Sequence, residues 1–201
     1  MSQIVNKAKE YVTEYLSNNL STDYKFHCIN HSFEVAKNAY EIGIGSHLEN
    51  KELDIVLLAA WFHDVGYSKC RKGHEKLSIN IAVEFLTKNN FPNKDIQQVK
   101  KCIEATKLSH KPISLLEEIL SDSDILHIGK KDYLEKSNLL RQELKKNQDL
   151  DCSDNEWIKR NIEFMSAHNF YTEYARTNYG PQRLRNIENL KNKLNNFIVR
   201  D

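Results

Sequence analysis

Glycine and proline are scarce in this chain, with six Gly and three Pro among 201 residues. An all-β fold of this length needs many tight turns, and most turn types rely on these two residues. The scarcity therefore excludes a β-sandwich or barrel and favours helices. A chain of 201 residues buries on the order of 70% of its unfolded surface, which is enough for a core with a pocket.

Paired cysteines and long apolar segments are also missing. The four cysteines are widely scattered and form no Cys-x-x-Cys pair, which excludes zinc-ribbon and thioredoxin-like sites and indicates reduced thiols. The N-terminal segment lacks the apolar core of a signal peptide, and no window approaches about 18 uncharged apolar residues. We therefore expect a cytoplasmic protein that does not span a membrane. The net charge of +1 gives no strong indication of a nucleic-acid partner.

Apolar residues recur at helical spacing along most of the chain. The pattern predicts a first helix from residue 4, a second over 26–43 with Asp23 as its cap, and a third over 53–64 that is apolar nearly all round and therefore central. Further helices are predicted at 74–90, 93–108, 112–121, 131–146, 155–169 and 182–199, with a loop at 171–182. We expect one compact all-α domain over 1–201, in which helices of 131–201 pack on a core at about 24–130.

Ionisable residues gather at three places in this pattern. His27 and His31 are four residues apart in the predicted second helix, so their side chains are expected on one face. His63 and Asp64 close the apolar run "AAWFHD", and "LSDSDIL" brings two more aspartates to the end of another apolar stretch. Imidazoles and carboxylates together suit a borderline divalent metal better than calcium, which prefers oxygen ligands alone.

The order of these residues resembles the HD superfamily of metal-dependent phosphohydrolases, whose signature is a His, then His-Asp, then a distant Asp. The corresponding residues are His31, His63, Asp64 and Asp124, the last preferred over Asp122 because the family's aspartate directly precedes an apolar residue. "HDVGY", "HEKLSINIAVEFL" and "DSDILHIG" resemble the family's neighbouring segments. The resemblance implies a helical bundle of the HD type that holds one divalent metal ion, with Mn, Fe, Co, Ni, Zn and Mg all compatible.

The resemblance also implies an enzyme that hydrolyses a phosphate ester by attack of a metal-activated water. A nucleotide or a related small phosphorylated molecule is the implied substrate. Asp64 would ligate the metal and orient or deprotonate the water. "FHCINHSFEV" is similar to a segment of cyclic-nucleotide phosphodiesterases in which the first His protonates the leaving oxygen. That similarity implies a general-acid role for His27, and the simpler alternative is a partly buried histidine bonded to backbone.

Substrate contacts are expected from four further residues. Lys69 and Arg71 follow the His-Asp pair closely enough to reach a phosphate, and His74 opens the next predicted helix. Arg176 lies in an aromatic and basic segment that could stack a base and hold phosphate. Each of the four also has a simpler interpretation as a solvated, helix-terminal or packing residue.

Two departures from the family pattern limit the interpretation. Thr106 stands where two-metal relatives have a further histidine, so two-iron oxygenase chemistry is not expected. Tyr67 stands where some nucleotidases have a catalytic glutamate. Two other functions stay open: a non-catalytic regulatory domain that binds a nucleotide or metal, and a metal-dependent lyase or oxygenase that would need a complete second metal site.

Overall fold

The computed structural model describes residues 2–147 and 150–198, and these residues form nine α-helices and two short 3-10 helices without a strand. The all-α fold expected from the scarcity of glycine and proline is confirmed. None of the described helices is long and apolar enough to cross a membrane. The α-helices are α1 (Gln3–Asn19), α2 (Ile29–Gly45), α3 (Asn50–Phe62), α4 (His74–Lys88), α5 (Asn93–Glu104), α6 (Leu115–Ile125), α7 (Tyr133–Lys146), α8 (Asp154–Ala167) and α9 (Glu173–Ile198), and the 3-10 helices are η1 (Val65–Ser68) and η2 (Leu126–Gly129).

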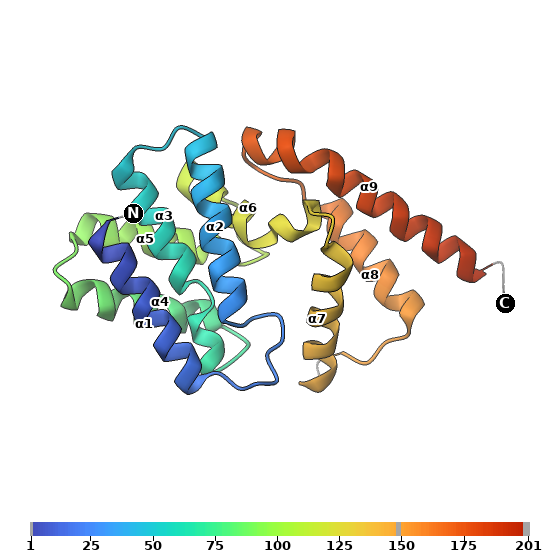
Figure 1. Ribbon diagram of the computed structural model, residues 1–201, viewed down its shortest axis with the longest axis horizontal. Coiled ribbons are helices and arrows are strands. Elements are labelled where there is room, and N and C mark those ends of the chain that lie inside the picture. Colours follow the sequence, from blue (N-terminus) through green and yellow to red (C-terminus); the bar gives the residue numbers. More distant parts are fainter. Residues whose placement is uncertain (1, 148–149, 199–201) are drawn as a thin grey trace.

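Helix α3 lies in the middle of the first six helices, as its apolar sequence predicts (Figure 1). It packs against α1, α2, α4, α5 and α6, and every side chain over 55–62 is buried. Glu49 and Glu52 form a reciprocal capping box that fixes the start of the helix. Full burial of each large apolar side chain contributes roughly 1.5–3 kcal/mol. The C-terminal end of α3 is therefore a rigid support for the residues that follow it.

Helices α7, α8 and α9 lie on the other side of the molecule, beyond α6 and η2 (Figure 1). Helices α8 and α9 pack on each other, and α9 also packs on η2 and α2. The buried carboxylate of Asp122 connects α6 to the segment before α9. It accepts hydrogen bonds from the backbone N–H groups of Tyr171 and Thr172 and from the Thr172 hydroxyl. The start of α9 is thereby anchored to α6.

The start of α2 differs from the prediction. The helix begins at Ile29 with Cys28 before it, so Asp23 is not its cap. The physical reason is Glu143 of α7, whose carboxylate accepts hydrogen bonds from the backbone N–H groups of Phe26 and His27 and holds them outside the helix. The prediction that His27 and His31 share one helix face was therefore wrong.

Helix α9 begins far earlier than predicted. The expected loop over 171–182 is helical from Glu173 onward, although Pro181 lies inside the helix. Local caps and tertiary contacts outweigh the proline: the Thr172 hydroxyl accepts a hydrogen bond from the backbone N–H of Ala175, and the Tyr179 hydroxyl bonds to a carboxylate oxygen of α2. The predicted helices at 74–90, 93–108, 131–146 and 155–169 are found within four residues of their expected ends.

Candidate metal centre

Three helices bring four ionisable side chains to one point. His31 projects from α2, His63 and Asp64 follow the last turn of α3, and Asp124 projects from α6. The Nε2 atom of His31 lies 2.9 Å from Oδ1 of Asp124 and 3.4 Å from Nε2 of His63. Oδ2 of Asp64 lies 3.2 Å from Nε2 of His63 and 3.5 Å from Nε2 of His31. We call these four residues the metal-ligand cluster, and they are the four that the sequence predicted as ligands.

The turn after the His-Asp pair explains why a glycine follows. A Cβ atom at Gly66 would lie 2.1 Å from the backbone oxygen of His74, so only glycine lets η1 approach the start of α4 this closely. The Gly66 backbone N–H also donates to the Ser78 hydroxyl over 2.9 Å. This close approach carries the first residue of α4, His74, to the edge of the cluster.

The donor set of the cluster suits a divalent cation. Nδ1 of His63 lies 2.8 Å from the carbonyl oxygen of Ala60, which only accepts hydrogen bonds, so Nδ1 carries a proton. Nε2 is then the nitrogen that would give its lone pair to a metal ion after losing its own proton. Oδ2 of Asp64 is buried and has no hydrogen-bond partner among the described residues. An unpaired buried carboxylate oxygen is costly unless a cation or a proton compensates it. One ligand atom each of His31, His63 and Asp124 lie within 4.8 Å of one another, close enough to share one ion.

The pKa shifts show that this point favours positive charge. Burial alone would lower the pKa of His63, but the carboxylates of Asp64 and Asp124 outweigh burial and raise it well above the usual value. Burial would raise the pKa of Asp64, but His63 and His74 hold it well below the usual value. The pKa of Asp124 is also lowered, because the interactions of its carboxylate with His31 and His63 outweigh the effect of burial. A metal ion bound among these groups would meet carboxylates that are already ionised.

His27 is held beside the cluster by a residue that the sequence analysis missed. Its Nδ1 lies 2.5 Å from Oε1 of Glu143, whose side chain is fully buried. Burial would raise the pKa of Glu143, but its bonds to His27 and to the backbone lower it below the usual value. Glu143 lies 116 residues along the chain, in a helix whose sequence reads as a charged surface, so no local signal identifies it.

The other ring nitrogen of His27, Nε2, lies 3.3 Å from the Tyr67 hydroxyl. The Tyr67 ring stacks on the ring of His27 and makes a tilted contact with the ring of His74. Burial and the nearby carboxylates raise the pKa of Tyr67 above its usual value, so its hydroxyl stays protonated. Tyr67 thus contacts His27 and His74 through its ring, at the position where some relatives have a glutamate.

The four predicted substrate contacts fall in different places. Nε2 of His74 lies 3.3 Å from Oδ1 of Asp64, and its Nδ1 lies 2.8 Å from the carbonyl oxygen of Arg71. Arg71 is partly buried near the cluster, whereas Lys69 is exposed at the end of η1. Arg176 is not brought to the cluster: it lies in the first turn of α9, donates to backbone carbonyls of the segment before that helix, and lines a separate pocket.

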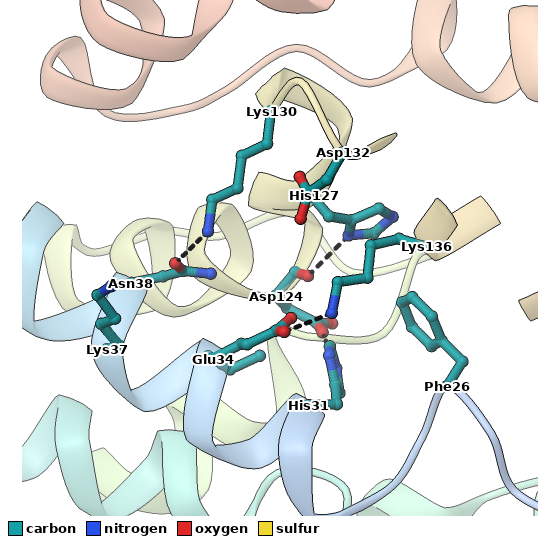
Figure 2. Close-up of a pocket in the computed structure, with 11 residues that line it drawn as sticks. Phe26, His31, Glu34, Lys37, Asn38, Asp124, His127, Lys130, Asp132 and Lys136 are labelled. Carbon is teal, nitrogen blue, oxygen red and sulfur yellow. Dashed lines mark hydrogen bonds and ion pairs between the residues drawn. The ribbon is translucent and has the colours of Figure 1, made fainter. Parts of the chain in front are cut away.

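A pocket of about 180 Å³ opens beside the cluster, and His31 and Asp124 form part of its wall (Figure 2). Three lysines that the sequence analysis did not single out also line it, namely Lys37, Lys130 and Lys136. The run "GKKD" directly after the "DSDILHIG" segment is a signal that could have drawn attention to Lys130. His127 also lines this pocket, and burial lowers its pKa to about 4, so its ring is neutral at physiological pH.

Comparison with known proteins supports the interpretation of this geometry. The HD domain family matches residues 28–129, a segment that contains the whole metal-ligand cluster. The fold is similar to the crystal structure of a Lactobacillus plantarum protein, with a TM-score of 0.71, 12% sequence identity, and coverage of 100% of this chain and 97% of that one. No curated protein sequence matches the chain. Because the family match spans more than half of the sequence and includes its cluster, the chain belongs to the HD-domain family.

Proposed function

We propose that this protein is a metal-dependent phosphohydrolase that hydrolyses a phosphate ester of a nucleotide or a related small molecule. The observation that carries the proposal is Oδ2 of Asp64, a buried carboxylate oxygen that lacks a hydrogen-bond donor in the described part of the chain and faces two imidazole nitrogens. Membership of a family of mostly metal-dependent hydrolases supports it. The ring of His27 lies beside that of His31, with 5.9 Å between the centroids, so an imidazole that is not a ligand stands next to the cluster.

The residues that would hold the ion are His31, His63, Asp64 and Asp124. A divalent ion bound there supplies a water that is nucleophilic at neutral pH and polarises a phosphoryl oxygen. Asp64 contributes more than a ligand atom, because its Oδ1 lies 3.3 Å from Nε2 of His74. Asp64 outweighs burial and raises the pKa of His74, and the ion pair with the protonated ring fixes the orientation of the carboxylate. A carboxylate held in this way is suited to orient the attacking water by accepting a hydrogen bond from it.

His27 is suited to give a proton to the leaving group. Glu143 accepts from Nδ1 of His27, which fixes the tautomer and leaves Nε2 as the atom that exchanges a proton. In the overall reaction the oxygen of one water bonds to phosphorus, and the bond between phosphorus and the leaving oxygen breaks. The proton lost by the water passes to solvent, and His27 protonates the leaving oxygen.

One screen tests the proposal. Purified protein is incubated with Mn²⁺, Fe²⁺, Co²⁺, Ni²⁺, Zn²⁺ or Mg²⁺ and with mono-, di-, tri- and cyclic nucleotides and non-nucleotide phosphate esters. We expect metal-dependent product release from at least one ester and its loss in His63→Ala, with the helical circular dichroism spectrum retained. No turnover with any metal would contradict the proposal, and nucleotide binding without product would favour a regulatory domain instead.

A further inference from the structure

The imidazole of His27 is not held in place by a helix. His27 lies in the segment before α2, where its backbone N–H donates to Glu143. The torsion that rotates a histidine ring has broad minima, so contacts of the ring must fix its plane. Glu143 also contacts one ring atom, Nδ1, and a single hydrogen bond at one edge fixes a direction but not a plane. A second residue is therefore needed to orient the imidazole.

The ring of Tyr67 lies flat against the ring of His27. The two rings are stacked, with 4.2 Å between their centroids and 12° between their planes. Phe26 and His31 contact the same imidazole at steep angles of 76° and 83°. Edge contacts limit how far the imidazole slides, whereas a parallel ring in van der Waals contact limits how far it tilts. The contact with Tyr67 therefore fixes the plane of the imidazole.

Tyr67 is itself held firmly. It is buried in η1, and its backbone N–H donates to the carbonyl oxygen of Asp64 over 3.0 Å. Its ring meets the edge of Tyr24, with 5.5 Å between the centroids, and the ring of His74 at 4.0 Å. The turn that follows the His-Asp pair thus carries the residue that contacts His27, so this turn connects the metal-ligand cluster to the His27 ring.

The Tyr67 hydroxyl lies 3.3 Å from Nε2 of His27. Because the Glu143 carboxylate accepts from Nδ1, the Nε2 atom of a neutral ring has a lone pair to which the hydroxyl donates. A protonated ring instead donates from Nε2, and the hydroxyl oxygen accepts. The hydroxyl is therefore a partner for both forms of the ring. The distance exceeds the usual range of about 2.7–3.2 Å, so another oxygen can replace this bond at little cost.

Other chemical roles do not suit the Tyr67 hydroxyl. Burial and the carboxylates of Asp64 and Glu143 raise the pKa of Tyr67 above its usual value, so the hydroxyl stays protonated at neutral pH. A protonated phenol is not a general base, and it is a far weaker acid than an imidazolium. The role that its contacts support is therefore exerted through His27.

We propose that Tyr67 is a positioning residue for the proton transfer from His27 to the leaving oxygen. Its ring fixes the plane of the imidazole, and its hydroxyl holds Nε2 until the leaving oxygen replaces it. The proton moves from Nε2 to the leaving oxygen as the bond between that oxygen and phosphorus breaks. The neutral ring then accepts a hydrogen bond from the Tyr67 hydroxyl, and solvent returns the proton. This inference rests on the proposed phosphohydrolase function and names a residue on which its leaving-group preference depends.

The kinetic test compares two variants of Tyr67 with a matched control. Tyr67→Phe keeps the ring and removes the hydroxyl, and Tyr67→Leu removes both. Tyr174→Phe is the control, because the Tyr174 hydroxyl makes a bond of similar length, 3.2 Å, to Glu41. On phenyl phosphate we expect kcat to fall by about 2- to 10-fold in Tyr67→Phe and by about 10- to 50-fold in Tyr67→Leu, with KM within about twofold. On p-nitrophenyl phosphate, whose leaving group needs little protonation, both losses should stay below about threefold.

A double variant separates positioning from a general effect on the fold. Tyr67→Leu should add less than about twofold to the loss in His27→Ala, because no imidazole is left to position. Additive losses on phenyl phosphate, or equal losses on the two esters, would overturn the inference while the proposed function stands. Absence of wild-type turnover with every ester of the screen would contradict the proposed function, and the inference with it.

Nuclear magnetic resonance tests the contact without any turnover. Long-range proton–nitrogen correlation spectra of the metal-free protein at alkaline pH report the unprotonated nitrogen of each neutral imidazole. The signals of His27 are identified by their absence in His27→Ala. We expect the Nε2 signal of His27 to shift in Tyr67→Phe and to keep its position in Tyr174→Phe. An unchanged Nε2 signal in Tyr67→Phe would show that the hydroxyl does not bond to His27 and would overturn the inference.

Discussion

Two aspartates that stand two residues apart on α6 have opposite surroundings. Asp122 accepts three hydrogen bonds of 2.7–2.8 Å from the backbone and hydroxyl groups that precede α9. Asp124 instead faces the Nε2 atoms of His31 and His63, at 2.9 and 3.5 Å. The hydrogen bonds of Asp122 thus all come from groups that hold the fold together. Asp124 instead faces imidazole nitrogens, which are also suitable ligands for a metal ion. The groups that contact a carboxylate therefore indicate whether it stabilises the fold or belongs to the site.

The largest expected effect comes from a ligand of the cluster. Asp64→Asn should lower metal affinity and reduce kcat/KM by at least about 1,000-fold, because loss of a ligand exceeds the 10- to 100-fold effect of removing an outer partner. The fold should be retained, since an amide at this position can donate to Nε2 of His63. Metal titration, a turnover assay and thermal unfolding measure the three quantities. Retained turnover in Asp64→Asn would contradict the distinction between carboxylates that bind the metal, such as Asp64 and Asp124, and carboxylates that stabilise the fold, such as Asp122.

Asp122→Ala should show the reverse pattern. The substitution leaves two backbone N–H groups and the Thr172 hydroxyl without their acceptor, so we expect the free energy of unfolding to fall by about 2–4 kcal/mol. Metal affinity should change by less than about threefold. Urea unfolding and metal titration of the same sample measure both quantities. Lost metal affinity with unchanged stability would show that Asp122, not Asp124, belongs to the site.

His27→Ala should spare the metal and slow the chemistry. General acid catalysis contributes about 100-fold or more, so kcat should fall by about 100-fold for an ester with a poor leaving group. An activated ester such as p-nitrophenyl phosphate needs little protonation and should lose far less. Equal losses on the two esters would show that His27 has only a structural role.

Glu143→Gln should have the smallest effect on turnover, about tenfold and with the same dependence on the leaving group, because it disturbs the orientation of His27 without removing it. Metal affinity should match the wild type. Glu143→Asp is the matched control, since it keeps the charge with a shorter side chain and should recover part of the activity. A uniform loss on both esters without recovery in Glu143→Asp would contradict this positioning role.

Much of the fold and the cluster could be predicted from local patterns. The nearly uninterrupted apolar run of α3 indicates a central helix, and its His-Asp end, together with an earlier His and a later Asp, indicates the family. The HD-domain family predicted in this way is confirmed by the match over 28–129. These features are predictable because each depends on residue types within a few positions of one another, or on their order along the chain.

The remainder depends on contacts between distant segments. Glu143 changes the start of α2 from 116 residues away, and no periodicity in either segment indicates the bond. Helix α9 includes Pro181 because contacts such as that between Tyr179 and Glu41 support its first turns. The pocket of about 180 Å³ beside the cluster combines one face of α2 with the segment after α6. Such pairings follow from tertiary packing, which local propensity does not encode.

One divalent ion per chain is the expected occupant of the metal-ligand cluster. Isothermal titration calorimetry measures its binding when the metal-free protein, Asp64→Asn and Asp122→Ala are each titrated with Mn²⁺. We expect one site per chain in wild type and in Asp122→Ala, and weakened or absent binding in Asp64→Asn. Absence of binding in wild type, or equal binding in all three proteins, would contradict it.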